Sequence, residues 1–217
     1  METDPQTKNS LFLSYMTLRQ LIGYLGITLP FVVSLGACWI FKDRMQPSIS
    51  GYYYTGIRDV FVGMLCAIGI FLFSYRAFGK ADDIAGNLAC LFALGVAWFP
   101  TAPVPEETAS ASARLIGHFH LGFAALFFLT LSYFCLFLFT KTDSPNPTRR
   151  KRQRNGVYRF CGGVMIACLV AMVIVHLLPK ASQDWTDSHH IIFWLESVAI
   201  VFFGISWLTK GEAILGD

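Results

Sequence analysis

Charged residues are scarce in this chain. Asp, Glu, Lys and Arg make up 14% of its 217 residues, whereas about a quarter of the residues of an average soluble domain are charged. Hydrophobic residues make up 54%, and 20 residues are Phe. A soluble core of this size cannot bury that much apolar surface, so an ordinary soluble domain is excluded and we expect a membrane protein. The net charge of +3 is small and predicts no nucleic-acid partner.

The chain also lacks the patterns that indicate a disulfide framework or a helical metal motif. A disulfide framework places cysteines in the connections, whereas all six cysteines here lie in apolar runs: Cys38, Cys66, Cys90, Cys135, Cys161 and Cys168. No histidine pair has the spacing HxxxH or HExxH that typifies a zinc helix. We predict that the cysteines pack as small apolar residues and that no cofactor is bound unless it is zinc.

Six apolar stretches remain, and each is long enough to cross a bilayer, which takes roughly 20 residues of helix. The predicted spans are residues 20–41, 57–75, 84–103, 115–140, 158–178 and 189–209. Polar residues precede the first span, and the span itself is too long for a signal peptide, so we expect it to be retained. The sequence predicts a single all-α domain over residues 1–217, a polytopic bundle of six transmembrane helices.

Lys and Arg are distributed unequally between the two sides of these helices. Twelve of the 17 fall on the side of the termini, and the other five are Lys42, Arg44, Arg58, Arg114 and Lys180. Most of the excess comes from the run Arg149-Arg150-Lys151-Arg152-Gln153-Arg154. Loops rich in Lys and Arg stay in the cytoplasm, so both termini are predicted to be cytoplasmic.

The same basic run has two interpretations. Clusters of Lys and Arg beside a membrane helix bind anionic lipid headgroups, but they are also the ordinary signal of cytoplasmic orientation. Pro145 and Pro147 precede the run. They favour a flexible loop whose charges only set the orientation.

The polar residues of the opposite, extracytoplasmic side form the candidate site. All five histidines fall there, at the ends of the fourth, fifth and sixth spans, and one glutamate lies deeper in the sixth. Ionisable groups at such positions are costly and usually functional. The predicted ligand-binding residues are Ser48, Ser50, Arg58, Asp59, Arg114, His118, His120, His176, His189 and Glu196.

Helical periodicity predicts which of these residues face one another. Glu196 lies seven residues after His189, about two helical turns, so we expect both on one face of the sixth helix. His118 and His120 are two residues apart, about 200° around a helix, and are predicted to point in different directions.

Three interpretations of this cluster stay open. Imidazoles and carboxylates suit zinc and a metal-activated water. Arginine, imidazole and hydroxyl groups also suit the phosphate of a lipid headgroup. The third interpretation is that these side chains only anchor the helices at the membrane interface, where His, Tyr and Arg are common. The predicted ligands, if zinc is present, are His118, His176, His189 and Glu196.

Four short motifs resemble a known family. They are Ser48-Ile49-Ser50-Gly51-Tyr52-Tyr53, then Arg58-Asp59-Val60-Phe61-Val62-Gly63, then His118 or His120 before Gly122-Phe123-Ala124, and finally Trp194-Leu195-Glu196-Ser197. Their arrangement resembles the Frag/DRAM/Sfk membrane family and a related bacterial family of six-helix proteins of unknown function. The resemblance implies a multi-pass protein linked to membrane lipids, and we expect it in the inner (plasma) membrane of a bacterium.

The chain also resembles the superfamily that includes the alkaline ceramidases, in which histidines, an aspartate and a serine surround zinc at one membrane face. Those proteins have a seventh helix and an HxxxH pair, which the six predicted spans do not supply. We therefore predict lipid headgroup binding or membrane-lipid handling, with membrane lipids as partners. A zinc-dependent lipid hydrolase is the alternative.

Overall fold

The protein is all-α in its computed structural model, which describes residues 5–76, 79–103, 109–142 and 145–216. The α-helices are α1 (Pro5–Gly36), α2 (Arg58–Ser74), α3 (Lys80–Trp98), α4 (Ala111–Tyr133), α5 (Arg149–His176), α6 (Lys180–Ser188) and α7 (Ile191–Lys210). The π-helical turns η1 (Ala37–Phe41) and η4 (Phe134–Leu138) extend α1 and α4, and a 3-10 helix, η2 (Ser50–Tyr54), precedes α2. The prediction of an all-α fold is confirmed for these residues.

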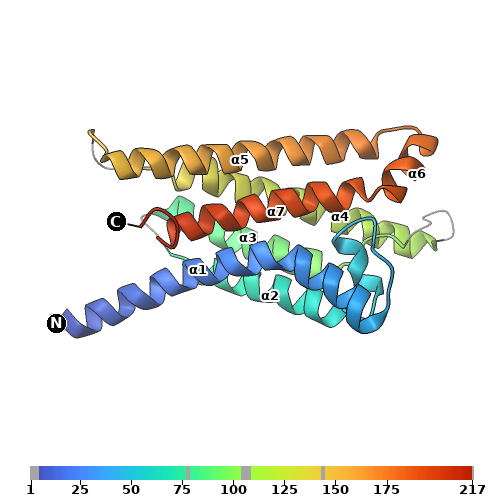
Figure 1. Cartoon of the computed structure of the whole chain (residues 1–217), viewed down its shortest axis with the longest axis horizontal. Helices are drawn as coiled ribbons and strands as arrows, with labels where there is room; N and C mark the ends of the chain where they lie inside the picture. The colour runs from blue at the N-terminus through green and yellow to red at the C-terminus, as the bar shows by residue number, and fades with distance from the viewer. Residues whose placement is uncertain (1–4, 77–78, 104–108, 143–144, 217) are drawn as a thin grey trace.

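Five of the described helices have the length and composition of membrane spans. They cover Ser14–Phe41, Lys80–Trp98, Ala111–Leu138, Arg149–His176 and Ile191–Lys210. α2 is shorter, at 17 residues, and is not among the five. The long helices run side by side, and the start of α1 and the end of α7 lie at the same end of the bundle (Figure 1). These helices indicate an integral membrane protein.

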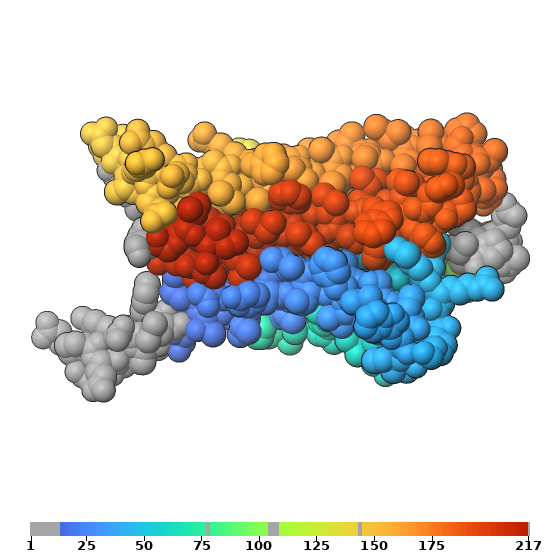
Figure 2. Space-filling model, in the orientation of Figure 1, coloured from blue at the N-terminus to red at the C-terminus, as the bar shows by residue number. Residues whose placement is uncertain are grey.

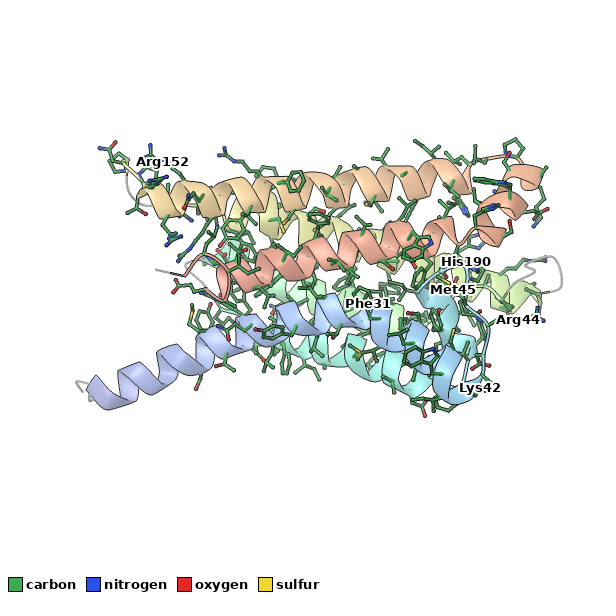
Figure 3. All side chains as sticks on the ribbon, viewed as in Figure 1. Phe31, Lys42, Arg44, Met45, Arg152 and His190 are labelled. Carbon is green, nitrogen blue, oxygen red and sulfur yellow. The ribbon has the colours of Figure 1, made fainter. Side chains whose placement is uncertain are left out.

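The outer surface of the bundle is apolar. Phe31 is 54% exposed, Ile70 54% and Phe160 63%, and only 28% of the apolar window of α5 is buried inside the protein. A bundle in water turns its apolar faces inward, so exposure on this scale requires a surrounding lipid phase. Basic groups mark both ends of this apolar surface: Figure 3 shows Arg152 at one end, and Lys42 and Arg44 at the other.

Glycines let α1 and α7 approach each other closely. A Cβ added at Gly204 would lie 2.6 Å from the carbonyl oxygen of Gly23, and one at Gly23 would lie 2.9 Å from the carbonyl oxygen of Gly204. Two helix backbones pack this closely only where side chains are absent. The two helices lie against each other on the face seen in Figure 2.

An aromatic cluster closes the end of the bundle that carries the termini. The ring of Trp207 lies 4.9 Å from that of Tyr75, 5.1 Å from that of Phe139 and 5.7 Å from that of Phe134, measured between centroids. The guanidinium of Arg19 lies 5.6 Å from the centre of the Tyr75 ring. The cluster joins α1, the end of α2, α7 and the turn η4 that extends α4.

The basic run at this end is helical. Arg149 to Arg154 form the first turns of α5, where the hydroxyl of Thr148 accepts a hydrogen bond from the N–H of Lys151 at 3.1 Å. Arg154 pairs with Glu212 at 3.2 Å. The prediction of a flexible loop here is wrong, because Thr148 caps a helix that begins directly after the prolines.

The last helix begins later than predicted. α6 fills the stretch before α7, and His190 joins the two helices in a left-handed backbone conformation, with φ 54° and ψ 36°. His189 therefore ends α6 instead of opening α7. The prediction that His189 and Glu196 share one face of a continuous helix is wrong, because the helix is broken between them.

Candidate ligand-binding pocket

The segment from residue 42 to residue 57 folds over the end of the bundle opposite the termini. The carboxylate of Asp43 accepts a hydrogen bond from the N–H of Gly56 at 2.8 Å, which closes the segment on itself. Tyr52 is fully buried and meets the ring of Phe193 edge-on at 6.2 Å. Pro47 accepts a hydrogen bond from the N–H of Phe193 at 2.8 Å. The segment, which we call the outer loop, is thus packed onto α7.

α7 forms hydrogen bonds to the outer loop at Phe193 and at Glu196, and Glu196 lies deeper in the bundle. Its carboxylate accepts a hydrogen bond from the N–H of Ile49 at 2.5 Å, and the N–H of Ser50 also interacts with it. These two amides precede and open η2, where backbone N–H groups lack partners within the helix. A carboxylate at that position satisfies them and complements the helix dipole.

His120 attaches the outer loop to α4. Its Nδ1 lies 2.6 Å from the carbonyl oxygen of Phe99, and its Nε2 lies 2.9 Å from the hydroxyl oxygen of Ser50. A carbonyl only accepts, so Nδ1 carries the proton of the neutral ring and Nε2 accepts the hydrogen bond from Ser50. His120 is 4% exposed and Ser50 8% exposed. The Ser-Ile-Ser sequence therefore lies between a carboxylate of α7 and an imidazole of α4.

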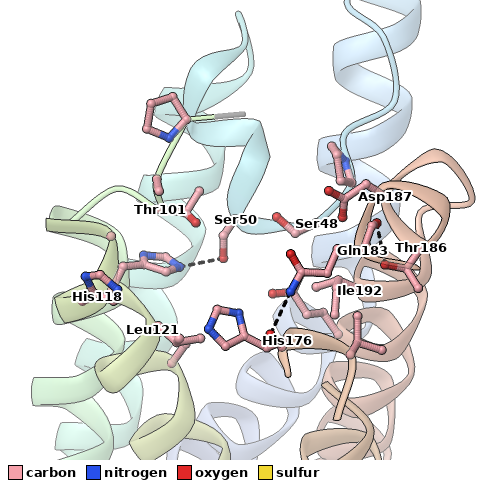
Figure 4. Close-up of a pocket in the computed structure, with 18 of the residues that line it drawn as sticks. Ser48, Ser50, Thr101, His118, Leu121, His176, Gln183, Thr186, Asp187 and Ile192 are labelled. Carbon is pink, nitrogen blue, oxygen red and sulfur yellow. Dashed lines mark hydrogen bonds between the residues drawn. The ribbon is translucent and has the colours of Figure 1, made fainter. Parts of the chain in front are cut away.

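A pocket of about 300 Å³ opens beside these contacts, between the outer loop, the segment after α3, and helices α4 to α7. Seven of the ten predicted ligand-binding residues line it: Ser48, Ser50, Arg114, His118, His120, His176 and Glu196. Figure 4 shows the labelled side chains of Ser50, His118 and His176 around one opening. His118 and His120 both reach this pocket although they differ in direction, because His118 lies on the exposed side of the opening and His120 in its buried wall.

Three predicted residues lie elsewhere. Arg58 and Asp59 pair with each other at 3.2 Å on the surface, where their side chains are 54% and 91% exposed. The ring of His189 stacks on Trp185 at 4.2 Å and is exposed to solvent. None of the three is among the residues that line the pocket. The first two point outward because they occupy the outer side of the first turn of α2.

Sequence reasoning did not identify the wall of the pocket that α6 forms. The residues of α6 that line the pocket are Lys180, Gln183, Asp184, Thr186 and Asp187. The amide of Gln183 donates to the carbonyl oxygens of His176 and Leu178, both at 2.9 Å, and holds α6 against the end of α5. The polar residues of this wall are spaced along one short helix. A search for long apolar runs does not detect such a helix.

Burial makes one group of this wall harder to ionise. It raises the pKa of the Asp187 carboxyl above its ordinary value, as does the neighbouring Asp184, whereas Lys180 and His190 act in the opposite direction. Lys180 also pairs with Asp184 at 3.5 Å. The wall therefore holds two carboxyl groups near one lysine, and its charge depends on whether Asp187 is ionised.

The predicted zinc ligands are divided by this arrangement. His118, His176 and Glu196 share the pocket, but His189 stacks on Trp185 outside it. In the part of the chain that the structure describes, no three His, Cys, Asp or Glu side chains are close enough to hold a metal ion together. The carboxylate of Glu196 already serves as the acceptor for Ile49.

Three of the four motifs that suggested a family meet at this site, and the motif that begins at Arg58 does not. Ser48 and Ser50 come from the first motif, His120 from the third and Glu196 from the fourth. Comparisons with protein families, with curated proteins and with solved structures found no match to this chain. The resemblance to the Frag/DRAM/Sfk family therefore stays a prediction, and function has to be argued from the chemistry of the pocket.

Proposed function

We propose that this protein binds the headgroup of a membrane phospholipid in the pocket between the outer loop and α4 to α7. The observation that carries the proposal is the placement of opposite charges on facing walls of one cavity. The positive charge on the α4 wall is Arg114, with the imidazole of His118 beside it, whereas the α6 wall holds Asp184 and Asp187 with Lys180 and is negative when both carboxyl groups are ionised. Figure 4 shows His118 on one side of the opening and Asp187 on the other.

This charge pattern fits a zwitterionic headgroup better than a purely anionic one. A phosphate is bound best by arginine and by N–H donors, which Arg114, His118 and His176 supply. An ammonium group is bound by carboxylates, which Asp184 and Asp187 supply. A headgroup that carries a phosphate and an amine a few ångströms apart matches both walls.

Apolar side chains of the pocket lining suit the start of the acyl chains. They are Leu121, Ala124, Val175 and Ile192, which belong to α4, α5 and α7. A cleft with both polar and apolar lining can accept an amphiphile. The proposed ligand is therefore a lipid that enters from the membrane with its headgroup at the outer loop.

Six membrane crossings are part of the same proposal. α2 has 17 residues, which is within the range of about 17–25 for a spanning helix. With α2 as a span, the chain crosses the membrane an even number of times. The excess of Lys and Arg on the side of the termini supports cytoplasmic ends, so the pocket would open on the extracytoplasmic side. The motifs that resemble the Frag/DRAM/Sfk family support lipid handling in a bacterial plasma membrane.

The test is lipid binding by the detergent-purified chain, measured by native mass spectrometry. The probes are dioctanoyl phosphatidylethanolamine, which has an amine, and dioctanoyl phosphatidylglycerol, which does not. Arg114→Gln should weaken the binding of both lipids about tenfold or more, the value of one charge-assisted hydrogen bond. Asp187→Asn should weaken the binding of the ethanolamine lipid alone.

The surface pair provides matched controls, since Arg58→Gln and Asp59→Asn change the same kinds of charge outside the pocket. Equal binding of both lipids, or equal effects of the pocket and surface variants, would overturn the proposal. The purified protein is also analysed for zinc. Stoichiometric zinc that is lost in His176→Ala would replace headgroup binding with the alternative, a zinc-dependent lipid hydrolase.

A further inference from the structure

Ser50 and His120 form a hydrogen-bonded pair that is more precisely oriented than attachment of the outer loop to α4 requires. The hydroxyl of Ser50 donates to Nε2 of His120 at 2.9 Å, and Nδ1 of His120 donates to the carbonyl oxygen of Phe99 at 2.6 Å. The second hydrogen bond fixes the tautomer in which Nε2 has a free lone pair. A hydroxyl, a base within hydrogen-bond reach and a third group that orients the base are the parts of an activated nucleophile.

We propose that Ser50 is a nucleophile, with His120 as its general base, and that the pair acts on an ester bond of the phospholipid bound in the pocket. The inference rests on the proposed function for the identity of its substrate. It goes further in assigning a reaction, acyl transfer from the lipid to Ser50 and then to water or to another alcohol.

The position of the pair in the pocket favours this role. Ser50 and His120 both line the cavity, and the hydroxyl of Ser50 points into it in Figure 4. The pair lies beside the apolar lining, where the ester bonds of a lipid would be when its headgroup contacts Arg114. His176 lines the same cavity, and in this proposal its ring N–H is the donor to the oxyanion.

The backbone around Ser50 is held rigidly. Glu196 binds the N–H of Ile49 at 2.5 Å, and the hydroxyl of Ser48 accepts a hydrogen bond from the N–H of Gly51 at 3.0 Å. A nucleophile must be held within about 0.5 Å of its productive position. The contacts on either side of Ser50 in the sequence restrain its backbone.

The reaction balances without any additional oxidant or metal. Oγ of Ser50 bonds to the carbonyl carbon of the ester, and its proton passes to Nε2 of His120. The bond between that carbon and the alcohol oxygen of the lipid breaks, and Nε2 returns the proton to the departing alcohol. Water then attacks the acyl-serine with His120 as base, which releases a fatty acid and restores the hydroxyl of Ser50.

A purely structural pair would show the same hydrogen bonds, so the test measures reactivity. The detergent-purified full chain is treated with an alkyl fluorophosphonate, and modified serines are located by mass spectrometry. Attack by Oγ of Ser50 forms a bond to phosphorus and releases fluoride, while His120 accepts the proton. We expect Ser50 to be labelled and His120→Gln to slow labelling by about 10²–10⁴-fold, the usual contribution of a general base.

The chain contains a matched comparison. The hydroxyl of Ser188 lies 3.0 Å from Nδ1 of His189, but this pair is exposed and outside the pocket. Ser188 should not be labelled, and Ser188→Ala should leave the labelling of Ser50 unchanged. His120→Gln keeps an amide for hydrogen bonding, and the thermal unfolding of this variant shows whether the fold is retained.

Lipid binding by native mass spectrometry separates this inference from the proposed function. Labelled Ser50, with octanoate released from the ethanolamine lipid and lost in Ser50→Ala, supports both. Unlabelled Ser50 in a wild-type protein that binds the lipid overturns the nucleophile and leaves headgroup binding standing. Labelled Ser50 without lipid binding keeps the nucleophile and overturns the phospholipid as its substrate.

Discussion

The carboxylate of Glu196 lies 2.5 Å from the backbone nitrogen of Ile49, although 147 residues separate them in the chain. The contact places the only acidic residue of α7 directly under the start of η2. It turns a costly group within a membrane helix into the partner of two amides that would otherwise lack acceptors. The contact acts together with the hydrogen bond from the N–H of Phe193 to Pro47 to hold the outer loop against α7.

Replacing Glu196 with alanine should therefore loosen the outer loop and lower stability. The loss of a hydrogen bond to a charged group costs about 1.5–3 kcal/mol. Glu196→Gln keeps an oxygen that can accept and should cost about 1 kcal/mol, the value of a neutral hydrogen bond. Both effects are measured by thermal unfolding in detergent and by hydrogen exchange at the amides of Ile49 and Ser50.

Asp59→Ala is the control, since its carboxylate is exposed at the start of α2. We expect no measurable change in its unfolding or in the exchange of the Ile49 amide. Rapid exchange of that amide only in the Glu196 variants identifies the carboxylate as the cap. Equal exchange in all variants would show that the outer loop is held by other contacts.

Much of the fold could be predicted from the sequence because the lipid bilayer constrains the composition of the helices that cross it. A spanning helix must be apolar over about 20 residues, and the long helices follow from that rule, α2 being the shortest of the six predicted spans. α6 could not be found in this way, since it has nine residues and is polar. Nor could the break at His190, because a left-handed conformation at a residue other than glycine leaves no sequence pattern.

The sequence predicted seven of the polar residues that line the pocket but not the α6 wall, and it did not predict the contacts that hold the site together. Isolated polar residues in apolar surroundings, such as Glu196 and His120, stand out because burying them is costly. Periodicity then assigned Glu196 the wrong neighbour, His189, since it assumed an unbroken helix. Its real neighbour is the backbone of Ile49, and a contact with a main-chain amide cannot be inferred from the identity of a side chain.

The close approach of α1 and α7 yields a second prediction. Gly204→Ala would place a methyl group 2.6 Å from the carbonyl oxygen of Gly23, and because that oxygen belongs to a helix backbone it cannot move aside. We expect the free energy of unfolding to fall by about 1–3 kcal/mol, the usual cost of overpacking. Unfolding is measured in detergent as a function of added denaturing detergent.

Gly63→Ala serves as the matched control for the same substitution. An added Cβ at Gly63 has no atom within 4 Å, and alanine favours helix over glycine. The protein should therefore keep or slightly gain stability with this change. A loss at Gly63 equal to that at Gly204 would mean that the two helices do not pack through their glycines.

The ion pair between Lys141 and Asp82, near the end of the bundle that carries the termini, gives a third prediction. Nζ of Lys141 lies 3.0 Å from the carboxylate of Asp82, whose side chain is only 3% exposed. Lys141→Met would leave that carboxylate buried without its partner. The expected loss is about 1–3 kcal/mol, less than for a fully buried pair, because the lysine is half exposed and Lys210 is also near Asp82.

The double variant Asp82→Asn with Lys141→Met tests the origin of that loss. Removing the carboxylate as well should recover most of the stability, since no uncompensated charge remains. Arg58→Met breaks the exposed pair with Asp59 and should have no measurable effect. A double variant less stable than Lys141→Met alone would show that Asp82 stabilises the fold through some other contact.

Asp187 gives a pH dependence whose sign follows from its environment. Burial raises the pKa of its carboxyl in the folded protein, so the folded state binds the proton more tightly than the unfolded state. The contribution of Asp187 to stability is then greatest at low pH and is lost as pH rises from about 3.9, the ordinary value for Asp, through the raised pKa. Asp187→Asn should remove this part of the pH dependence, measured as the difference in Tm between wild type and variant across that range.

The proposed ligand should change the same measurement. An ammonium group beside Asp187 favours its ionised form, so saturating dioctanoyl phosphatidylethanolamine should reduce the difference in pH dependence between wild type and Asp187→Asn. Dioctanoyl phosphatidylglycerol has no ammonium group and should leave that difference unchanged. An equal effect of the two lipids would mean that the amine does not contact Asp187, whereas parallel curves for wild type and variant without lipid would mean that burial does not hold the proton on this carboxyl.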